Sequence, residues 1–487
     1  MILIQIVGVF WTIILFILLS LSSGRCFTSN IYITLFFISS FIWFFCYYFS
    51  RSKDAKLKNW GLRPSYICLL GLIIVNLQFP LDYAFGLIPS LDTIISGSSK
   101  YFDSLYFGGL IFVTVFVITN NVCSGTKIQQ LLNTNSNNVS NTRIWLILYM
   151  VSFIGFIMFI NIRDFLTGTV YLSSGASNAS SGLSNSFEGL FNVFLVIYVA
   201  VKSNIVLSLN KRLNLIEFLK TFPVIFWIVF LIYLVLRLLS GDRGPVMYNL
   251  LLMVYAYTIL SRKLIKLTVT VPIIAVSAIL ITFMGLIRSR DTSMSFLEKI
   301  HASVIRYDEL RATSVPTISP PTAELAHSIL CNYIAIRDVE SETTNYKLGS
   351  YTYISLFSSF PGAKRSYFYG LGLEDSDFSS ANYITESYNR SKSYDYGLGT
   401  SVLAESYLDG GIYGIMIVAI ICGWIFKNID MCFIDKKNIS VPYLIMTLKI
   451  ASLSLYLSRS SLSLTLGNLI YIFIIYIVIN SFTKLCK

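Results

Sequence analysis

The sequence predicts an all-α polytopic membrane protein with about 12 transmembrane helices and one large polar segment. Its 487 residues are 55% hydrophobic and only 13% charged, and the mean hydropathy is +0.69. This composition is typical of polytopic membrane proteins. Because a backbone in lipid must satisfy its own hydrogen bonds, we expect the long apolar runs to be helices.

The apolar runs have the length that a bilayer-spanning helix needs, roughly 20 residues. They cover approximately residues 2–21, 31–50, 66–84, 105–121, 144–162, 189–206, 221–239, 246–260, 268–287, 410–426, 441–457 and 464–482. The first run has no basic region before it and no obvious small-residue cleavage site. We therefore interpret it as a retained span rather than a signal peptide.

The orientation follows from the basic residues, because the cytoplasmic loops of membrane proteins are enriched in Lys and Arg. The second connection, residues 51–63, is strongly basic and is therefore placed in the cytoplasm. Counted alternately from it, the other cytoplasmic segments carry Lys127, Arg143, Lys202, Lys211, Arg212, Lys220, Arg262, Lys263, Lys266, Lys427, Lys436, Lys437, Lys484 and Lys487. Both termini are then cytoplasmic, and the large polar segment lies on the outer face.

The large polar segment, residues 288–409, is dense in Tyr, Phe, Leu and Ile. A loop of this length is either functional or disordered, and disordered chains are poor in aromatic residues. We therefore expect a folded external domain that carries the chemistry. The chain accordingly divides into a membrane domain over 1–287 with about nine transmembrane helices, the loop domain over 288–409, and a second membrane domain over 410–487 with about three.

The formal net charge of +12 does not indicate a nucleic-acid partner. The polar segment holds more acidic than basic residues, so the basic excess lies in the short loops, as membrane topology requires. The eight cysteines show no spacing typical of zinc ligands or of a disulfide framework. Asp375 and Asp377 lie in a Ser-rich acidic run that is typical of a solvated loop, so we expect no metal and no cofactor.

Four arginines, Arg243, Arg288, Arg290 and Arg459, lie at tight positions on the predicted outer face. Each opposes the positive-inside rule. Singly, each could extend to lipid headgroups or pair with a neighbouring aspartate. As a set they favour a bound anion, because the guanidinium fork suits phosphate oxygens.

Three side chains are candidates for a general base: His327, Glu324 one helical turn before it, and Glu405 at the re-entry into lipid. A lone histidine is more often a packing or surface residue. Glu405 is expected to have a partner, because burying a carboxylate costs free energy unless it is paired or hydrogen-bonded. Arg243 or Arg459 is the natural candidate for that partner.

Aromatic residues crowd the second half of the polar segment, Tyr396 among them, and Tyr407 lies close to Glu405. Most should form the core of the loop domain or lie at the membrane interface. An aromatic ring can also stack on a sugar while a tyrosine hydroxyl hydrogen-bonds to it. We therefore count Tyr396 and Tyr407, together with Arg459 and Glu324, as candidate substrate-binding residues. Lys449, in the middle of an apolar run, is expected to pair with a polar neighbour.

Several short motifs stand out along the chain. They are SGDRGP over 240–245, the arginines 288 and 290, TAEL over 322–325, GSY over 349–351 with FP at 360–361, and above all GLGTSVLAESYLDGGIYG over 397–414. Together these motifs resemble those of the Wzy-type O-antigen polysaccharide polymerases. The pattern of spans is similar over nearly the whole chain.

The resemblance implies a GT-C-like membrane glycosyltransferase in the inner membrane of a Gram-negative bacterium, with its large loop in the periplasm. Its substrates would be oligosaccharide repeat units on undecaprenyl pyrophosphate. The growing chain would pass from its carrier to a new lipid-linked unit, and undecaprenyl pyrophosphate would leave. A chain-length regulator of the same pathway is the implied protein partner.

The candidate residues suit that chemistry. Arginines at a water-poor membrane surface would stabilise the negative charge that develops on the leaving group. Glu405, Glu324 or His327 would take the proton of the attacking hydroxyl.

Two alternatives fit part of the same pattern. An O-antigen ligase, which passes the finished chain to lipid A–core, shares the many spans and the large outer loop. A flippase or other transporter of lipid-linked oligosaccharide would suit the number of spans. It would not need a folded outer domain, and the sequence lacks the internal repeat that is typical of such transporters.

Overall fold

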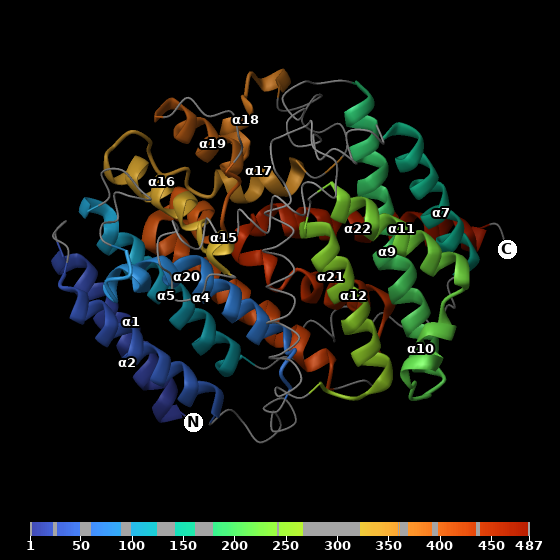
Figure 1. Ribbon diagram of the computed structural model, residues 1–487, viewed down its shortest axis with the longest axis horizontal. Helices are drawn as coiled ribbons and strands as arrows, with labels where there is room; N and C mark the ends of the chain where they lie inside the picture. Colours follow the sequence, from blue (N-terminus) through green and yellow to red (C-terminus); the bar gives the residue numbers. More distant parts are fainter. Residues whose placement is uncertain are drawn as a thin grey trace, which may run out of the picture. The chain divides into compact units, whose positions relative to one another are not determined.

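The structure is a computed structural model (Figure 1) that describes most of the chain. The described residues are 2–22, 27–48, 60–88, 99–123, 142–160, 179–240, 243–265, 322–358, 360, 369–391, 398–434 and 439–485. Within these residues the regular structure is helical, without a strand.

The helices are named here in chain order. They are α1 (Ile2–Ser22), α2 (Ser29–Tyr48), α4 (Pro64–Ala84), η3 (Ser99–Tyr101), α5 (Phe102–Val122), α7 (Thr142–Phe159), α9 (Ala179–Ser208), α10 (Leu215–Thr221), α11 (Val224–Leu239), α12 (Arg243–Ser261), α15 (Ala323–Ala326), α16 (Ile329–Glu340), α17 (Ser350–Ser358), η8 (Tyr369–Leu371), α18 (Asp375–Phe378), α19 (Ser380–Ser391), α20 (Val402–Cys432), α21 (Val441–Ser452), η9 (Tyr456–Arg459) and α22 (Leu462–Leu485).

Nine of the described helices are long and apolar enough to cross a membrane, namely α1, α2, α4, α5, α7, α9, α12, α20 and α22. The bent pair of α10 and α11 would bring the number to ten, and α21 is apolar but shorter. These helices lie at the predicted runs, except that the run at 268–287 is outside the described residues. A multi-pass helical membrane architecture is confirmed, whereas the described part of the chain does not confirm a count of twelve.

The predicted span at 221–239 begins three residues before helix α11 and crosses a bend. The axes of α10 and α11 differ by 95° across the break between them. Proline fixes its own φ and disfavours helical conformation in the residue before it. Accordingly Phe222 is extended, and Pro223 stands as the N-cap of α11. Helix α11 therefore begins at Val224, and its 16 residues count as a candidate span only together with α10.

The predicted run at 441–457 is also longer than the helix that it contains. Helix α21 ends at Ser452, after 12 residues. The Ser452 hydroxyl donates to the carbonyl of Lys449 at 2.7 Å, a side-chain bond that competes with the helical ladder. A turn and the short helix η9 follow.

The helix at the re-entry, α20, begins eight residues before the predicted run at 410–426. Ser401 caps its first turn, because the backbone N–H of Ala404 donates to the Ser401 hydroxyl at 2.9 Å. The helical geometry is then interrupted at Gly410 and Gly411. Gly411 has a φ of 59°, which glycine adopts without a steric penalty. Helix α20 thus consists of a short first segment, Val402–Asp409, and a long apolar second segment.

The described contacts divide the chain into two units. The first comprises residues 1–126, 315–431 and 454–471, and the second comprises residues 127–314, 432–453 and 472–487. Helices α15 to α19 of the polar segment belong to the first unit. Helix α16 packs there against α4 and α5. Most of its apolar residues are buried, so this helix of the polar segment is built onto apolar helices of the first unit.

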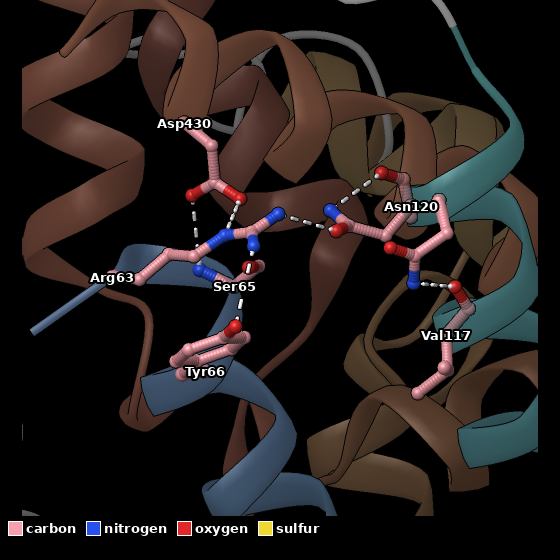
Figure 2. A network of polar contacts seen from close by, with 8 residues as sticks. Arg63, Ser65, Tyr66, Val117, Asn120 and Asp430 are labelled. Atoms are coloured by element: carbon pink, nitrogen blue, oxygen red, sulfur yellow. Dashed lines mark hydrogen bonds and ion pairs between the residues drawn. The ribbon is translucent and has the colours of Figure 1, made fainter. Parts of the chain in front are cut away.

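A buried ion pair ties three helices of the first unit together (Figure 2). Arg63, at the N-cap of α4, donates from Nε to Asp430 of α20 at 2.6 Å, and both side chains are buried. The same guanidinium donates to the Asn120 side chain of α5 at 3.0 Å. Asp430 also accepts from the backbone N–H of Ser65 at 3.3 Å, and Asn120 donates to the carbonyl of Gly423 at 3.3 Å. This Arg63 cluster satisfies two charges that would otherwise be costly to bury.

Candidate functional site

Glu405 lies in the first turn of α20 and is 3% exposed. Its Oε1 atom accepts from the Ser463 hydroxyl at 2.7 Å and from the Ser463 backbone N–H at 3.3 Å. Its Oε2 atom accepts from the Ser380 hydroxyl at 3.1 Å, and Ser461 contributes a further side-chain hydrogen bond. Three serines from the start of α22 and the start of α19 thus surround this carboxylate.

This arrangement corrects the expectation of an arginine partner within the first unit. Arg459 is not among the described partners of Glu405. Hydroxyl and N–H donors from distant segments satisfy the carboxylate instead, which is sufficient to bury it. Arg243 belongs to the second unit.

A chain of buried polar side chains supports the start of α20. Ser401, its N-cap, donates to the side-chain oxygen of Asn332 on α16. The Asn332 amide in turn donates to the side-chain oxygen of Asn76 on α4 at 2.8 Å. All three side chains are buried. The turn that carries Glu405 is therefore fixed to two other helices of the first unit.

The end of the first segment of α20 is fixed as well. Asp409 accepts from the backbone N–H groups of Tyr351 and Thr352, both at 3.0 Å, and from the Thr352 hydroxyl at 2.5 Å. These N–H groups lie in the first turn of α17, so Asp409 satisfies free donors of that helix. The backbone N–H of Lys347 donates to the carbonyl of Leu408 at 2.9 Å.

Tyr407 is buried, and its hydroxyl donates to Glu340 of α16 at 2.9 Å. Tyr346 lies beside it, with 6.5 Å between the ring centroids. Tyr346 also contacts the helix break, since a Cβ added at Gly411 would meet its ring. Burial raises the pKa of the Tyr346 phenol, and the nearby Glu340 carboxylate raises it further. Tyr346 therefore contacts the break, while Tyr407 beside it connects α20 to α16.

Arg459 ends η9 and is half-buried. Burial raises the pKa of the Cys331 thiol on α16 to about 12, and the positive charge of Arg459 opposes that rise. The Cys331 sulfur lies 3.7 Å from the carbonyl oxygens of Leu398 and Gly399, in the turn before α20. Arg459 thus acts electrostatically on the same region of the first unit that leads into the Glu405 turn. Burial thus disfavours the Cys331 thiolate, which is the form of cysteine that acts as a nucleophile.

The structure places the remaining predicted residues as follows. His327 is the C-cap of α15, is exposed, and lies against the Phe79 ring at 5.0 Å between centroids. Glu324 lies in α15, and Arg243 is the first residue of α12. Arg288, Arg290 and Tyr396 lie outside the described residues.

In the second unit, the helix that begins at Arg243 is held by a polar group that the sequence did not reveal. Asn249 of α12 donates to Asn192 of α9 at 3.2 Å. Asn192 donates to the Tyr233 hydroxyl at 3.3 Å, and that hydroxyl donates to Glu188 at 2.7 Å. Glu188 also pairs with Arg237 of α11. A buried charge pair and two amides therefore connect α9, α11 and α12.

The sequence gives little indication of the polar residues that surround Glu405. Asn332, Ser380 and Ser463 are small polar residues of common types, and nothing in their spacing relates them to Glu405. Asn76 is a polar residue within the apolar run at 66–84, and such a residue usually faces the interior of a helix bundle. No group of three or more His, Cys, Asp or Glu residues in the described part of the chain could hold a metal ion.

One comparison with known proteins gives a match. A family model described as O-antigen polysaccharide polymerase Wzy matches residues 6–487. No curated protein and no solved structure matches the chain. The matched range includes both units, from within α1 to the end of α22.

Proposed function

Because the chain belongs to the O-antigen polysaccharide polymerase Wzy family, we propose that it elongates a polysaccharide on undecaprenyl pyrophosphate at the periplasmic face of the inner membrane. The donor is the growing chain on its carrier, and the acceptor is a new lipid-linked repeat unit. The fold is of the GT-C kind, and the large loop faces the periplasm. A chain-length regulator acts with it.

The proposed reaction is a displacement at the anomeric carbon of the donor. An acceptor hydroxyl oxygen forms a bond to that carbon, while the bond from the carbon to the pyrophosphate oxygen breaks. The hydroxyl proton passes to a protein base, and undecaprenyl pyrophosphate leaves with the bonding electrons. Negative charge grows on the leaving group, so arginines nearby lower the barrier. Arg243, Arg288 and Arg290 are proposed for this role, with Arg459 binding substrate.

The observation that best supports an active site in the first unit is the buried Glu405 carboxylate at the start of an apolar helix. The serine hydroxyls orient the carboxylate by donating hydrogen bonds to it. A hydroxyl of the acceptor sugar could donate to it in the same way. Glu405 is therefore proposed to bind that hydroxyl and to take its proton. Glu324 of α15 and His327 at its C-cap remain the other candidate bases, and Tyr396 and Tyr407 are proposed to contact sugar.

The arginine variants test this function directly. Arg243→Ala and Arg288→Ala are each expected to lower the rate by about 10²–10³-fold, the usual loss when one donor to a developing charge is removed. The polysaccharide ladder should collapse to a single repeat unit on the core, whereas loss of a ligase would leave none. Arg→Lys should also be poorly tolerated, because the fork is lost although the charge remains.

The matched control is Arg262→Ala, which removes an arginine just past the other end of α12 and should keep the ladder. Each variant protein is quantified in the membrane fraction by immunoblot. Normal ladders from both Arg243→Ala and Arg288→Ala would show that these arginines only anchor helices.

The proposed orientation is tested with reporter fusions. Because alternate loops are uniformly basic, alkaline phosphatase fused near Thr343 should be active and the same enzyme fused near Lys56 should be silent. A reporter that works only in the cytoplasm should give the opposite pattern at the same two positions. An inverted result would contradict the periplasmic site and the function with it.

A further inference from the structure

Helix α17 presents two large aromatic side chains away from the described core. Tyr353 is 55% exposed and Phe357 is 59% exposed. Residues four apart lie on the same face of a helix, so the two rings form one apolar face. On another side of the helix Tyr351 is buried, and its hydroxyl donates to the carbonyl of Ser376 at 2.8 Å. The orientation of α17 is therefore fixed, and the Tyr353/Phe357 face remains open to a ligand.

One end of α17 lies at the candidate site. Its first-turn N–H groups, from Tyr351 and Thr352, donate to Asp409. Asp409 follows Glu405 by one helical turn, within the same short segment of α20. The apolar face thus begins close to the carboxylate at which we place the reacting sugar.

The other end of the helix reaches well along a membrane-spanning helix. Phe360, which follows α17, lies against Tyr471 of α22, with 6.2 Å between ring centroids. Tyr471 is nine residues beyond Leu462, which corresponds to about 13.5 Å along α22. The start of α22 lies beside Glu405, because the Ser463 hydroxyl donates to the Glu405 carboxylate. The nine residues of α17 also span about 13.5 Å.

These two connections place α17 alongside the first turns of α22. The end of α17 therefore lies about 13.5 Å beyond the start of α22, beside a helix that is long and apolar enough to cross a membrane. A tyrosine and a phenylalanine on an exposed face beside an apolar helix suit a hydrocarbon ligand rather than a sugar or a soluble peptide. The proposed substrate is a lipid whose tail must leave the site toward the bilayer.

We propose that the Tyr353/Phe357 face of α17 binds the isoprenoid chain of the lipid-linked substrate and leads it from the bilayer to the Glu405 site. This inference rests on the proposed function for the identity of the lipid. The face supplies apolar contact area to the isoprenoid chain, while the N–H groups at the start of α17 remain hydrogen-bonded to Asp409.

The first experiment measures binding, independently of catalysis. A photoreactive phenylalanine analogue is placed at position 353 or 357 of the full-length protein in membranes, and radiolabelled undecaprenyl pyrophosphate is added. Light should attach the label at both positions, and an excess of unlabelled undecaprenyl pyrophosphate should abolish the labelling. The same analogue at position 371, an exposed leucine of η8, should give little labelling. Labelling that the excess does not reduce would mean that the face contacts bulk lipid, and would overturn the inference.

The second experiment measures transfer with donors whose tails differ in length. The wild-type protein should have a lower KM for the undecaprenyl donor than for a donor with a two-isoprene tail. Tyr353→Ser with Phe357→Ser should raise the undecaprenyl KM about tenfold, which corresponds to about 1.4 kcal/mol, and should leave kcat and the short-tail KM unchanged. Leu371→Ser should change none of these values.

The outcomes separate the inference from the function on which it rests. An unchanged undecaprenyl KM in the double variant, or an equal rise for both donors, would overturn the tail-binding role. Competed labelling together with no transfer by the wild-type protein would instead support the tail site and contradict the polymerase reaction.

Discussion

The Glu405→Ala variant is expected to reduce the polysaccharide ladder to a single repeat unit, with the protein still present in the membrane. A general base contributes about 10²–10⁴-fold to a rate, and the loss should fall in that range. Folding should tolerate the change better than catalysis does. The three serines left behind are neutral, and hydroxyls in a helix turn can donate to backbone carbonyls instead.

The Glu405→Gln variant separates the two roles that the carboxylate could have. The amide keeps the size of the side chain and one oxygen acceptor for Ser463, so a positioning role should leave partial activity. A group that takes a proton should lose nearly all of it. The pH dependence of the residual rate is the second readout, because a lost base removes the acidic limb of the profile whereas a lost positioning contact does not.

Ser463→Ala is the matched control for this pair of variants. It removes one donor to Glu405 and leaves the carboxylate in place. A hydrogen bond to a charged group contributes about 1.5–3 kcal/mol, so its activity should lie between wild type and Glu405→Ala. A full ladder from Glu405→Ala at normal protein level would leave the carboxylate only as an acidic residue favoured at a helix N-terminus.

The Arg63→Ala variant is expected to lose most of the folded protein. Removing one partner of a buried ion pair costs about 3–5 kcal/mol, because the other charge stays buried without compensation. A protein typically has about 5–15 kcal/mol of net stability, so this loss is a large part of the total. Of its described partners, Asp430 would keep the Ser65 N–H, and Asn120 would lose the guanidinium. The measurement is the midpoint temperature of aggregation in detergent, followed by fluorescence-detected size exclusion.

The double variant Arg63→Met with Asp430→Leu is the control for the ion pair. Replacing both members of a buried pair by apolar residues is often neutral or stabilising, so the double variant should recover much of what Arg63→Ala loses. Arg63→Lys should be intermediate, because lysine keeps the charge but cannot reach Asp430 and Asn120 with one planar group. A wild-type midpoint for Arg63→Ala would show that the Arg63 cluster does not hold α4, α5 and α20 together.

The bends and breaks of the helices lie at residues that the sequence itself marks. Pro223 marks the bend before α11, and Ser401 with Gly410 and Gly411 marks the cap and the break of α20. These are local effects of φ, of the missing proline N–H and of glycine freedom. The hydropathy of the apolar runs does not reveal these caps and breaks, because a mean over about 20 residues is insensitive to a single helical turn.

The sequence by itself determined that the protein crosses a membrane many times and where most of the helices lie. Hydropathy suffices for that, because a span satisfies its hydrogen bonds within one continuous segment. It also singled out Glu405 as a buried carboxylate that needs a partner.

Only the tertiary structure decided what that partner is. Ser380 and Ser463 are 25 and 58 residues from Glu405 in the sequence, and Arg63 is 367 residues from Asp430. Such pairs leave no periodicity in the sequence, because side chains of common types are selected by the space and the unsatisfied groups that distant helices bring together. The Tyr353/Phe357 face likewise became apparent only when α17 was found fixed between Asp409 and Tyr471.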